Sequence, residues 1–308
     1  MRELGDVIPP IYQIDSAWSA GGDGAQLDTN NVLWLINPQG TTGIFDTADN
    51  RLNHTAFNEY AGAQRSRNYL NTLPITLAGK AQGADPAGVA AARRAFAGLL
   101  ADGNQHTLTV TDVDGTVLTI TVEQNGKAQV TPQSQGLDFD WQLNMIAADP
   151  HKYTRSFSIN TPLPSGSGGL DWSTGGGLNW ATGGGLNWGI AGNSGLLTLV
   201  NSGSSEVWPQ FTIGPLIDGN TLTNPAIINQ NTGRMLQFID VLGNDIVVIK
   251  QDPHNRSVTK NGAPYRRNLQ IAQWFSIPAQ SSITIQFQGT SANITALLNA
   301  QYPLAAFA

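Results

Sequence analysis

The chain has 308 residues, only 12% of them charged, a net charge of −6 at pH 7 and no cysteine. These values exclude a disulfide framework and thiolate metal sites, and they argue against a basic surface for nucleic acid. Residues 1–163 hold 16 acidic and 10 basic side chains, whereas the later part of the chain has equal numbers of each. No basic, apolar leader and no run of 18 apolar residues occurs, so neither a signal peptide nor a membrane span is expected.

Residues 1–163 are predicted to form an N-terminal domain that is mainly β with one helix. An apolar run at 31–37 suits a buried strand. A helix is expected from the N-cap Asp85 to Gly103, because apolar residues recur there at helical spacing. Alternating residues on both sides of Asp114-Gly115 predict a hairpin over 107–122.

Residues 164–195 contain the sequence Gly-Gly-Leu-Asx-Trp three times at a period of eight residues. We expect this segment to connect two domains and to dock, because exposed tryptophans on a free tether would be adhesive. A flexible Gly-rich linker is the alternative. The candidate docking residues are Leu170, Trp172, Leu178, Trp180, Leu186 and Trp188.

Residues 196–308 are predicted to form a second domain. Seven or more short strand candidates follow one another between turns, with at most one short helix at 291–298. Such spacing indicates a β-sandwich. The fold class is therefore mainly β throughout.

The sequence offers no catalytic, metal-binding or cofactor-binding constellation. Its four histidines, His54, His106, His151 and His254, are interpreted as surface or capping residues. Asp112 to Gly115 suits a turn better than a calcium loop. Asp138 and Asp140 could pair for acid–base chemistry. Two carboxylates on the solvent-exposed face of a strand, without a catalytic role, are the commoner case. Trp172, Trp180, Trp188, Trp208 and Trp274 could stack on sugars, or could anchor cores and interfaces.

Several short motifs appear in a distinctive order. The first half ends in WQLNMIAADPHKY at 141–153. The second contains WPQFTIGP at 208–215, NPAI at 224–227, TG at 232–233 and LGND at 242–245. This order resembles the distal tail protein (Dit) family of siphophages, and the Gly/Trp repeat is similar to minor tail proteins of phages of actinobacteria.

The resemblance implies a structural virion protein at the tail tip and no enzyme. It implies an N-terminal β-barrel or sandwich-type ring domain (1–163), a repeat connector (164–195) and a C-terminal jelly-roll-like, galectin- or CBM-like sandwich (196–308). The expected partners are five further copies in a hexameric ring, the major tail tube protein and the tail hub protein. The tape measure protein, receptor-binding proteins and a host glycan are further candidates.

DNA would pass through the channel of the ring without specific binding, and an acidic lumen would help it slide. A phage-borne carbohydrate-binding adhesin is the alternative function. A glycan-degrading tail enzyme is a third possibility, which would require a carboxylate pair in a cleft.

Overall fold

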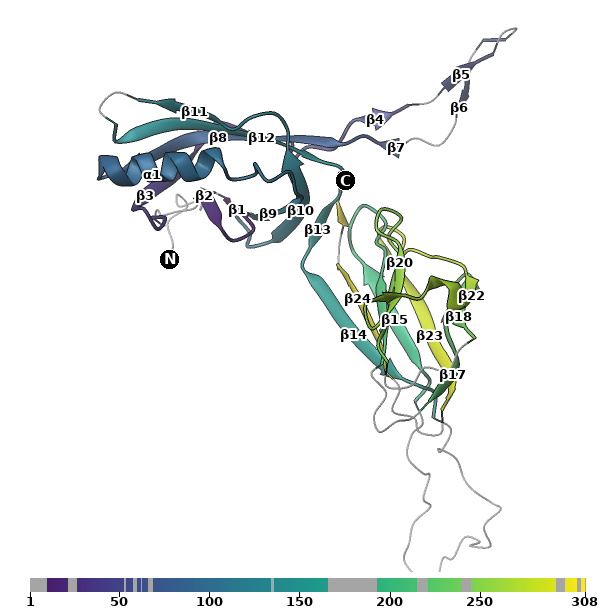
Figure 1. Ribbon diagram of the computed structural model, residues 1–308. Helices are drawn as coiled ribbons and strands as arrows, with labels where there is room; N and C mark the ends of the chain where they lie inside the picture. The colour runs from purple at the N-terminus through teal and green to yellow at the C-terminus, as the bar shows by residue number, and fades with distance from the viewer. Residues whose placement is uncertain are drawn as a thin grey trace, which may run out of the picture. The chain divides into compact units, whose positions relative to one another are not determined.

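A computed structural model describes residues 10–21, 27–52, 54–57, 60–61, 63–65, 69–133, 136–165, 193–214, 221–239, 245–291, 297–303 and 306–307 (Figure 1). The chain divides into two compact units. Unit 1 comprises Met1–Arg155 with Phe307–Ala308, and unit 2 comprises Ser156–Ala306. Unit 2 is thus inserted into the sequence of unit 1.

Unit 1 is built on one long antiparallel sheet in the order β2-β1-β9-β10-β12-β8-β3, to which β11, β13 and β25 add at the sides. Strand β10 pairs with β9 along its first part and with β12 at its end, so it links the two halves of the sheet. The bounds are β1 Ile11–Ile14, β2 Trp18–Gly21, β3 Val32–Thr42, β8 Leu73–Gly83, β9 His106–Thr111, β10 Val117–Gln124, β11 Gln129–Pro132, β12 Asp138–Ala147, β13 Lys152–Thr154 and β25 Ala306–Phe307.

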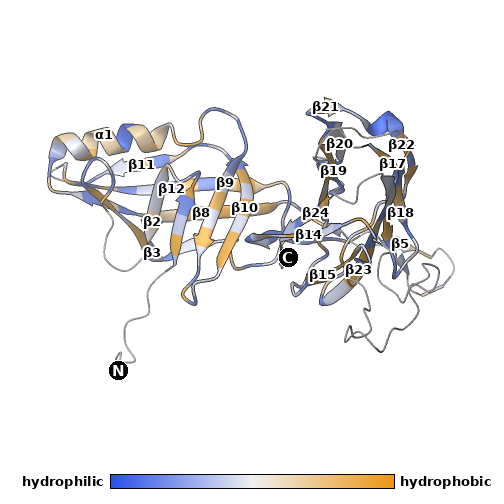
Figure 2. Ribbon diagram, turned by 90° about the horizontal axis from the view of Figure 1, so that it is seen from below, coloured by the Kyte–Doolittle hydropathy of each residue, from blue (hydrophilic) through white to orange (hydrophobic). Residues whose placement is uncertain are grey.

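The strands of unit 1 alternate as a half-buried sheet requires. Every second residue of β12 is buried, and Figure 2 shows hydrophobic and hydrophilic residues alternating along β8, β9 and β10. The helix α1 (Pro86–Ala97) packs against β8, β3 and β11. Asp85 caps it by accepting a hydrogen bond of 3.0 Å from the Gly88 amide. Among the described residues, no helix is long and apolar enough to cross a membrane.

The core of unit 1 is centred on an aromatic cluster in which helix and sheet meet. Phe96 of α1 contacts Trp18, Trp34 and Trp141, and Phe139 packs edge-on to Trp34. All five side chains are buried. Gly79 of β8 makes this packing possible, because a Cβ there would lie 2.7 Å from Cζ2 of Trp141 and 1.8 Å from the Leu35 carbonyl oxygen. The sequence places these rings on three strands and one helix, so the cluster exists only in the folded unit.

Unit 2 is a β-sandwich of two antiparallel sheets, in the orders β14-β24-β16-β19-β20-β21 and β15-β23-β17-β18-β22. The first sheet comprises β14 Ser156–Pro162, β16 Gln210–Ile213, β19 Val247–Lys250, β20 Ser257–Lys260, β21 Ala263–Pro264 and β24 Leu297–Pro303. The second comprises β15 Leu196–Asn201, β17 Leu222–Asn229, β18 Met235–Phe238, β22 Leu269–Ala272 and β23 Ser281–Ser291. Its core contains Phe211, Phe238, Phe275 and Phe287, each fully buried. A short 3-10 helix, Arg266–Asn268, precedes β22.

The mainly-β prediction is confirmed, with one α-helix among the residues that the structure describes and a C-terminal sandwich. Some bounds differ. The helix ends at Ala97, where the Gly98 amide caps Ala95 and Phe96, and not at Gly103. Strand β3 continues past Pro38 to Thr42, with its register shifting between Ile36 and Thr41. No helix is found at the described ends of 291–298, which are the last residue of β23 and the first two of β24.

The described residues on both sides of the Gly/Trp repeat belong to unit 2. Strand β14 precedes it and pairs with β24, while β15 follows it and pairs with β23. The Ser165 amide donates to the Asn193 carbonyl at 2.9 Å, and the Asn193 amide donates to Ser165 Oγ at 2.8 Å. The sequence predicts a connector between two domains here, but the strands on both sides belong to the sandwich. The six predicted docking residues of the repeat lie outside the described residues.

Candidate assembly and binding surfaces

A narrow ribbon extends the sheet of unit 1 between β3 and β8. Strands β4 (Asn50–Arg51) and β7 (Tyr69–Leu70) pair with each other, as do β5 (His54–Ala56) and β6 (Ala63–Arg65). A 2.8 Å hydrogen bond from the Asn71 amide to the Asp49 carbonyl closes its base. Figure 1 shows this ribbon, which we call the arm (residues 49–71), projecting from the side of unit 1 where β8 begins.

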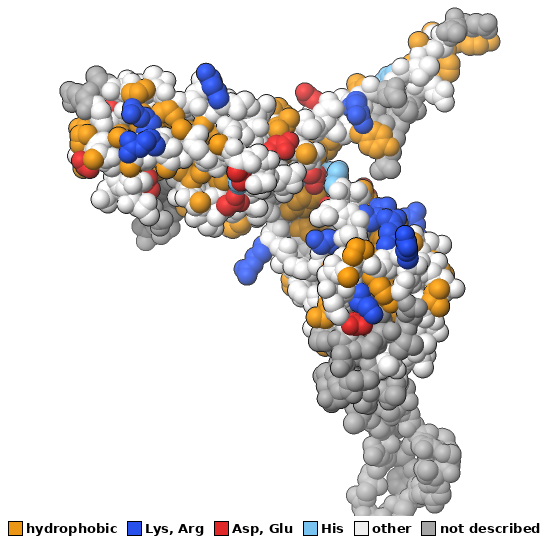
Figure 3. All heavy atoms as spheres, in the orientation of Figure 1, with side chains coloured by type: hydrophobic (Ala, Val, Ile, Leu, Met, Phe, Trp, Pro, Cys, Tyr) orange, Lys and Arg blue, Asp and Glu red, His pale blue; other side chains and the backbone are white. Residues whose placement is uncertain are grey.

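The arm carries large apolar side chains without a core to bury them. Leu52 is 61% exposed, Phe57 50% and Tyr60 78%. Figure 3 shows hydrophobic side chains gathered along it. An isolated two-stranded ribbon is at best marginally stable in water, and clustered exposed apolar residues mark interaction sites. The arm is therefore a surface suited to contact with another chain.

The segment leading to the arm is firmly held. Gly43 adopts φ +84°, and a Cβ there would lie 2.1 Å from the Pro74 carbonyl oxygen. Its amide donates to Asp46 Oδ2 at 2.9 Å. The buried ammonium of Lys152 donates to the Asp46 carbonyl, and burial lowers the pKa of this lysine. The root of the arm is thus tied to β13.

The end of the motif at 141–153 is held by hydrogen bonds to Asp149. This carboxylate accepts from the His151 amide at 3.1 Å, from His151 Nδ1 at 2.6 Å and from the Tyr153 hydroxyl at 2.7 Å. Burial acts to raise the pKa of Asp149, but the hydrogen bonds from His151 and Tyr153 outweigh it and lower the pKa. The part of the motif between the two strands, residues 148–151, directs β12 into β13.

A second histidine joins distant parts of unit 1. His106 Nδ1 lies 2.5 Å from Asp15 Oδ2, and its Nε2 lies 2.8 Å from Asp102 Oδ1. The hydrogen bonds to Asp15 and Asp102 raise the pKa of His106. Those from Asn104 and His106 lower the pKa of Asp102 to about 2. This clamp ties the turn after β1 to the start of β9, which is a structural role.

The paired carboxylates considered in the sequence also have structural partners. Asp138 forms a 2.6 Å ion pair with Lys80, and Asp140 accepts from Gln133. Asp114 lies in the β9–β10 turn, where it accepts from the Thr116 amide at 2.8 Å. None of Asp114, Asp138 and Asp140 lines the pocket that is described below.

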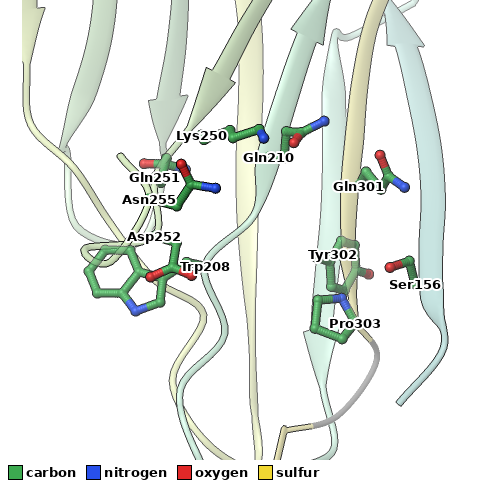
Figure 4. A pocket seen from close by; sticks show the side chains of 10 residues that line it. All are labelled: Ser156, Trp208, Gln210, Lys250, Gln251, Asp252, Asn255, Gln301, Tyr302 and Pro303. Atoms are coloured by element: carbon green, nitrogen blue, oxygen red, sulfur yellow. The ribbon is translucent and has the colours of Figure 1, made fainter. Parts of the chain in front are cut away.

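Unit 2 contains a pocket of about 290 Å³ over the outer face of its first sheet (Figure 4). In Figure 4, Trp208, Asp252 and Asn255 lie on one side, and Ser156, Tyr302 and Pro303 lie on the other. Gln210 and Lys250, on neighbouring strands, lie next to each other between them. The lining residues are Ser156, Trp208, Gln210, Lys250, Gln251, Asp252, Asn255, Gln301, Tyr302 and Pro303.

Of the tryptophans considered for sugar stacking, Trp208 and Trp274 are described. The Arg256 guanidinium carbon lies 5.9 Å from the Trp208 ring centroid and 4.9 Å from that of Trp274. Arg266 lies 5.6 Å from the Trp274 centroid, so two cations cover that ring. Only Trp208 lines the pocket. The sequence did not single out the polar lining, because it is assembled from strands far apart along the chain.

Two solved phage structures share the fold of this chain. One is the Dit protein (gp 19.1) of SPP1, described as a paradigm of the hub adsorption apparatus in phages that infect Gram-positive bacteria. It matches with a TM-score of 0.63 and 12% identity, over 97% of this chain and 99% of that chain. The other is from the baseplate of phage P2 in its activated conformation with Ca. It has a TM-score of 0.50 and 10% identity, over 95% of this chain and 97% of that chain.

No protein-family model and no curated protein sequence matches the chain. The likeness is therefore one of fold, and it extends over nearly the whole length of both chains. It confirms the resemblance to distal tail proteins at the level of the fold.

Proposed function

Because this chain has the fold of a phage Dit protein over nearly its whole length, we propose that it is a structural component of a siphovirus tail tip. Copies of unit 1 form a hexameric ring that joins the tail tube protein to the tail hub protein and leaves a channel for DNA. Unit 2 faces outward and contacts other tail proteins or the host envelope. The protein acts by assembly and needs no active site for this role.

The arm is the observation that best supports a ring. A cyclic assembly uses one pair of complementary patches at every joint. The arm offers one such patch, with Leu52, Phe57 and Tyr60 exposed and a root fixed by Lys152. Contact with a neighbouring copy would bury these side chains and would stabilise a ribbon that its own unit does not cover.

The charge of residues 1–163 is compatible with a channel. Its excess of six acidic side chains would repel the phosphates of passing DNA if the acids faced the lumen. A map of these acids on an assembled ring tests this part of the proposal. Acids confined to the outer wall would contradict it.

The experiment is a comparison of assembly between the full chain and an arm-deleted variant. Arg51 and Tyr69 are directly paired, so residues 52–68 can be replaced by Asn-Gly, which closes a two-residue hairpin. A Thr55→Ser variant, which keeps the arm, is the control. Negative-stain microscopy and native mass spectrometry should show six-fold rings for the full chain and the control, and monomers for the deletion.

Two results would contradict the proposal. Rings formed equally well by the deletion would show that the arm is not the joint. Full-length chains that stay monomeric at every concentration would contradict self-assembly through the arm and would favour the adhesin alternative.

A further inference from the structure

We propose that the pocket beside Trp208 in unit 2 binds a neutral saccharide of one or two pyranose units. The pocket lies over the outer face of the first sheet, where β24, β16 and β19 run side by side. Its volume of about 290 Å³ is just below the usual range for small-molecule sites, which begins at about 300 Å³.

A row of polar side chains crosses this face. Gln301 is directly opposite Gln210, and Gln210 is directly opposite Lys250. Directly paired residues of antiparallel strands point to the same face, so the three side chains lie in line over two strand spacings, roughly 10 Å. Ser158, opposite Gln301, and Ser257, opposite Lys250, extend the row at its two ends.

These polar groups are available to a ligand. Within the described residues, the side chains of Gln210, Lys250 and Gln301 make no hydrogen bond or ion pair, nor does that of Asn255. Amides both donate and accept hydrogen bonds, as sugar hydroxyls do. Four free polar side chains over one small pocket therefore suit a ligand rich in hydroxyl groups.

Trp208 supplies an apolar platform, and its surroundings hold it in place. Gln251, 1% exposed, donates from Nε2 to the Pro209 carbonyl at 3.3 Å and accepts from the Phe275 amide at 3.1 Å. Arg256 stacks near the indole and donates from Nε to the Gln251 carbonyl at 3.2 Å. An indole face next to hydrogen-bonding side chains suits the two aspects of a pyranose, its C–H face and its hydroxyl rim.

Charge favours a neutral ligand. Lys250 and Asp252 are the only charged side chains that line the pocket, and their formal charges cancel. Asp252 accepts from the His254 amide at 2.9 Å and from His254 Nδ1 at 3.0 Å, so this carboxylate is held at the rim, where it would repel an anionic ligand. The lining therefore carries no net charge that would select a phosphate or a uronic acid.

Binding at this site does not depend on ring formation. Only the source of the saccharide, an envelope polysaccharide of the host, rests on the proposed function. Saccharide binding by a chain that never forms rings would keep the site and would overturn the tail-tip role. Rings that bind no saccharide would keep the tail-tip role and would overturn the saccharide site.

The test is saturation-transfer NMR and calorimetry on the full chain with defined probes. The neutral probes are the methyl glycosides of glucose, galactose, mannose and N-acetylglucosamine, and the anionic probes are glucuronate and inorganic phosphate. At least one neutral probe should bind with a Kd of about 1 mM. Trp208→Ala and Gln210→Ala should each weaken it about fivefold to tenfold.

Gln237→Ala is the matched control, because Gln237 is a half-buried amide on β18 of the other sheet. It should change the affinity less than twofold. Gln210→Ala changes no core residue, so it tests the site even if Trp208→Ala unfolds the sandwich.

The proposal is overturned if no neutral probe binds at about 20 mM, twenty times the expected Kd. It is also overturned if phosphate or glucuronate binds more tightly than every neutral probe. Equal loss of binding in Gln237→Ala and Gln210→Ala would place the ligand elsewhere.

Discussion

Replacing Phe96 with alanine should detach α1 from the core of unit 1. The ring is 1% exposed and lies 5.2 Å from Trp34, 5.4 Å from Trp141 and 5.8 Å from Trp18, measured between centroids. Truncating a buried phenylalanine costs about 3–5 kcal/mol. Because three aromatic contacts are lost together, we expect the upper end of this range, about 4–5 kcal/mol.

The assay is urea unfolding followed by hydrogen-exchange mass spectrometry, which reads the two units separately. Peptides of unit 1 should lose protection at a lower urea concentration, while peptides of unit 2 should keep their midpoint. Arg94→Ala is the control, because Arg94 is exposed on the same helix. A surface change of this kind should cost about 0.5 kcal/mol or less.

A loss below about 1.5 kcal/mol in Phe96→Ala would refute the reasoning, because a side chain with these contacts cannot be removed so cheaply unless the core collapses around the gap. An equal loss of protection in unit 2 would refute the treatment of the two units as separate cores.

Three further predictions concern unit 1. Gly79→Ala should abolish protection of β3 and β8 in hydrogen exchange, whereas Gly98→Ala, whose Cβ would meet nothing closer than 3.7 Å, should be neutral or stabilising. The pKa of folded His106 lies above 6.5, so its contribution is complete below pH 6.5 and is lost as the pH rises through the raised value. The difference in Tm between wild type and His106→Gln should therefore be largest between about pH 4 and 6.5, and a pH-independent difference would contradict this. Lys152→Met leaves the Asp46 carbonyl without its donor, so exchange at the root of the arm should quicken, with a cost of about 1–3 kcal/mol; unchanged exchange there would mean that Lys152 does not hold the root.

The elements that the sequence predicts well are marked by two adjacent residues whose local conformational preferences are strong. Asp85 followed by Pro86 marks the start of α1, and Asp114-Gly115 marks the β9–β10 hairpin. The end of the helix was harder to predict, because Gly98 and Gly103 both come after apolar residues at helical spacing and either could be the C-cap. Gly98 caps the helix at φ −98°, an angle open to any residue, so composition alone could not choose between them.

The arm and the pocket could not be predicted for different reasons. The four strands of the arm are two or three residues long and are largely exposed, so no apolar alternation marks them. The pocket depends on register, since Gln210, Lys250 and Gln301 become neighbours only when β16 pairs with β19 and β24. Polar and apolar residues alternate along β16 and β24, but the sequence does not say which strands are adjacent.

The place of β25 has a consequence for the order of folding during synthesis. The chain leaves unit 1 after Arg155 and returns at Phe307, where β25 pairs with β13. While the ribosome makes the intervening residues, β13 has its β10 partner but one bare edge, which is a template for wrong pairing. Unit 2 can fold during this interval, as domains do on the ribosome. Residues 306–307 then complete unit 1 last. A chain truncated before residue 306 would have a folded unit 2, but one edge of β13 in unit 1 would stay unpaired.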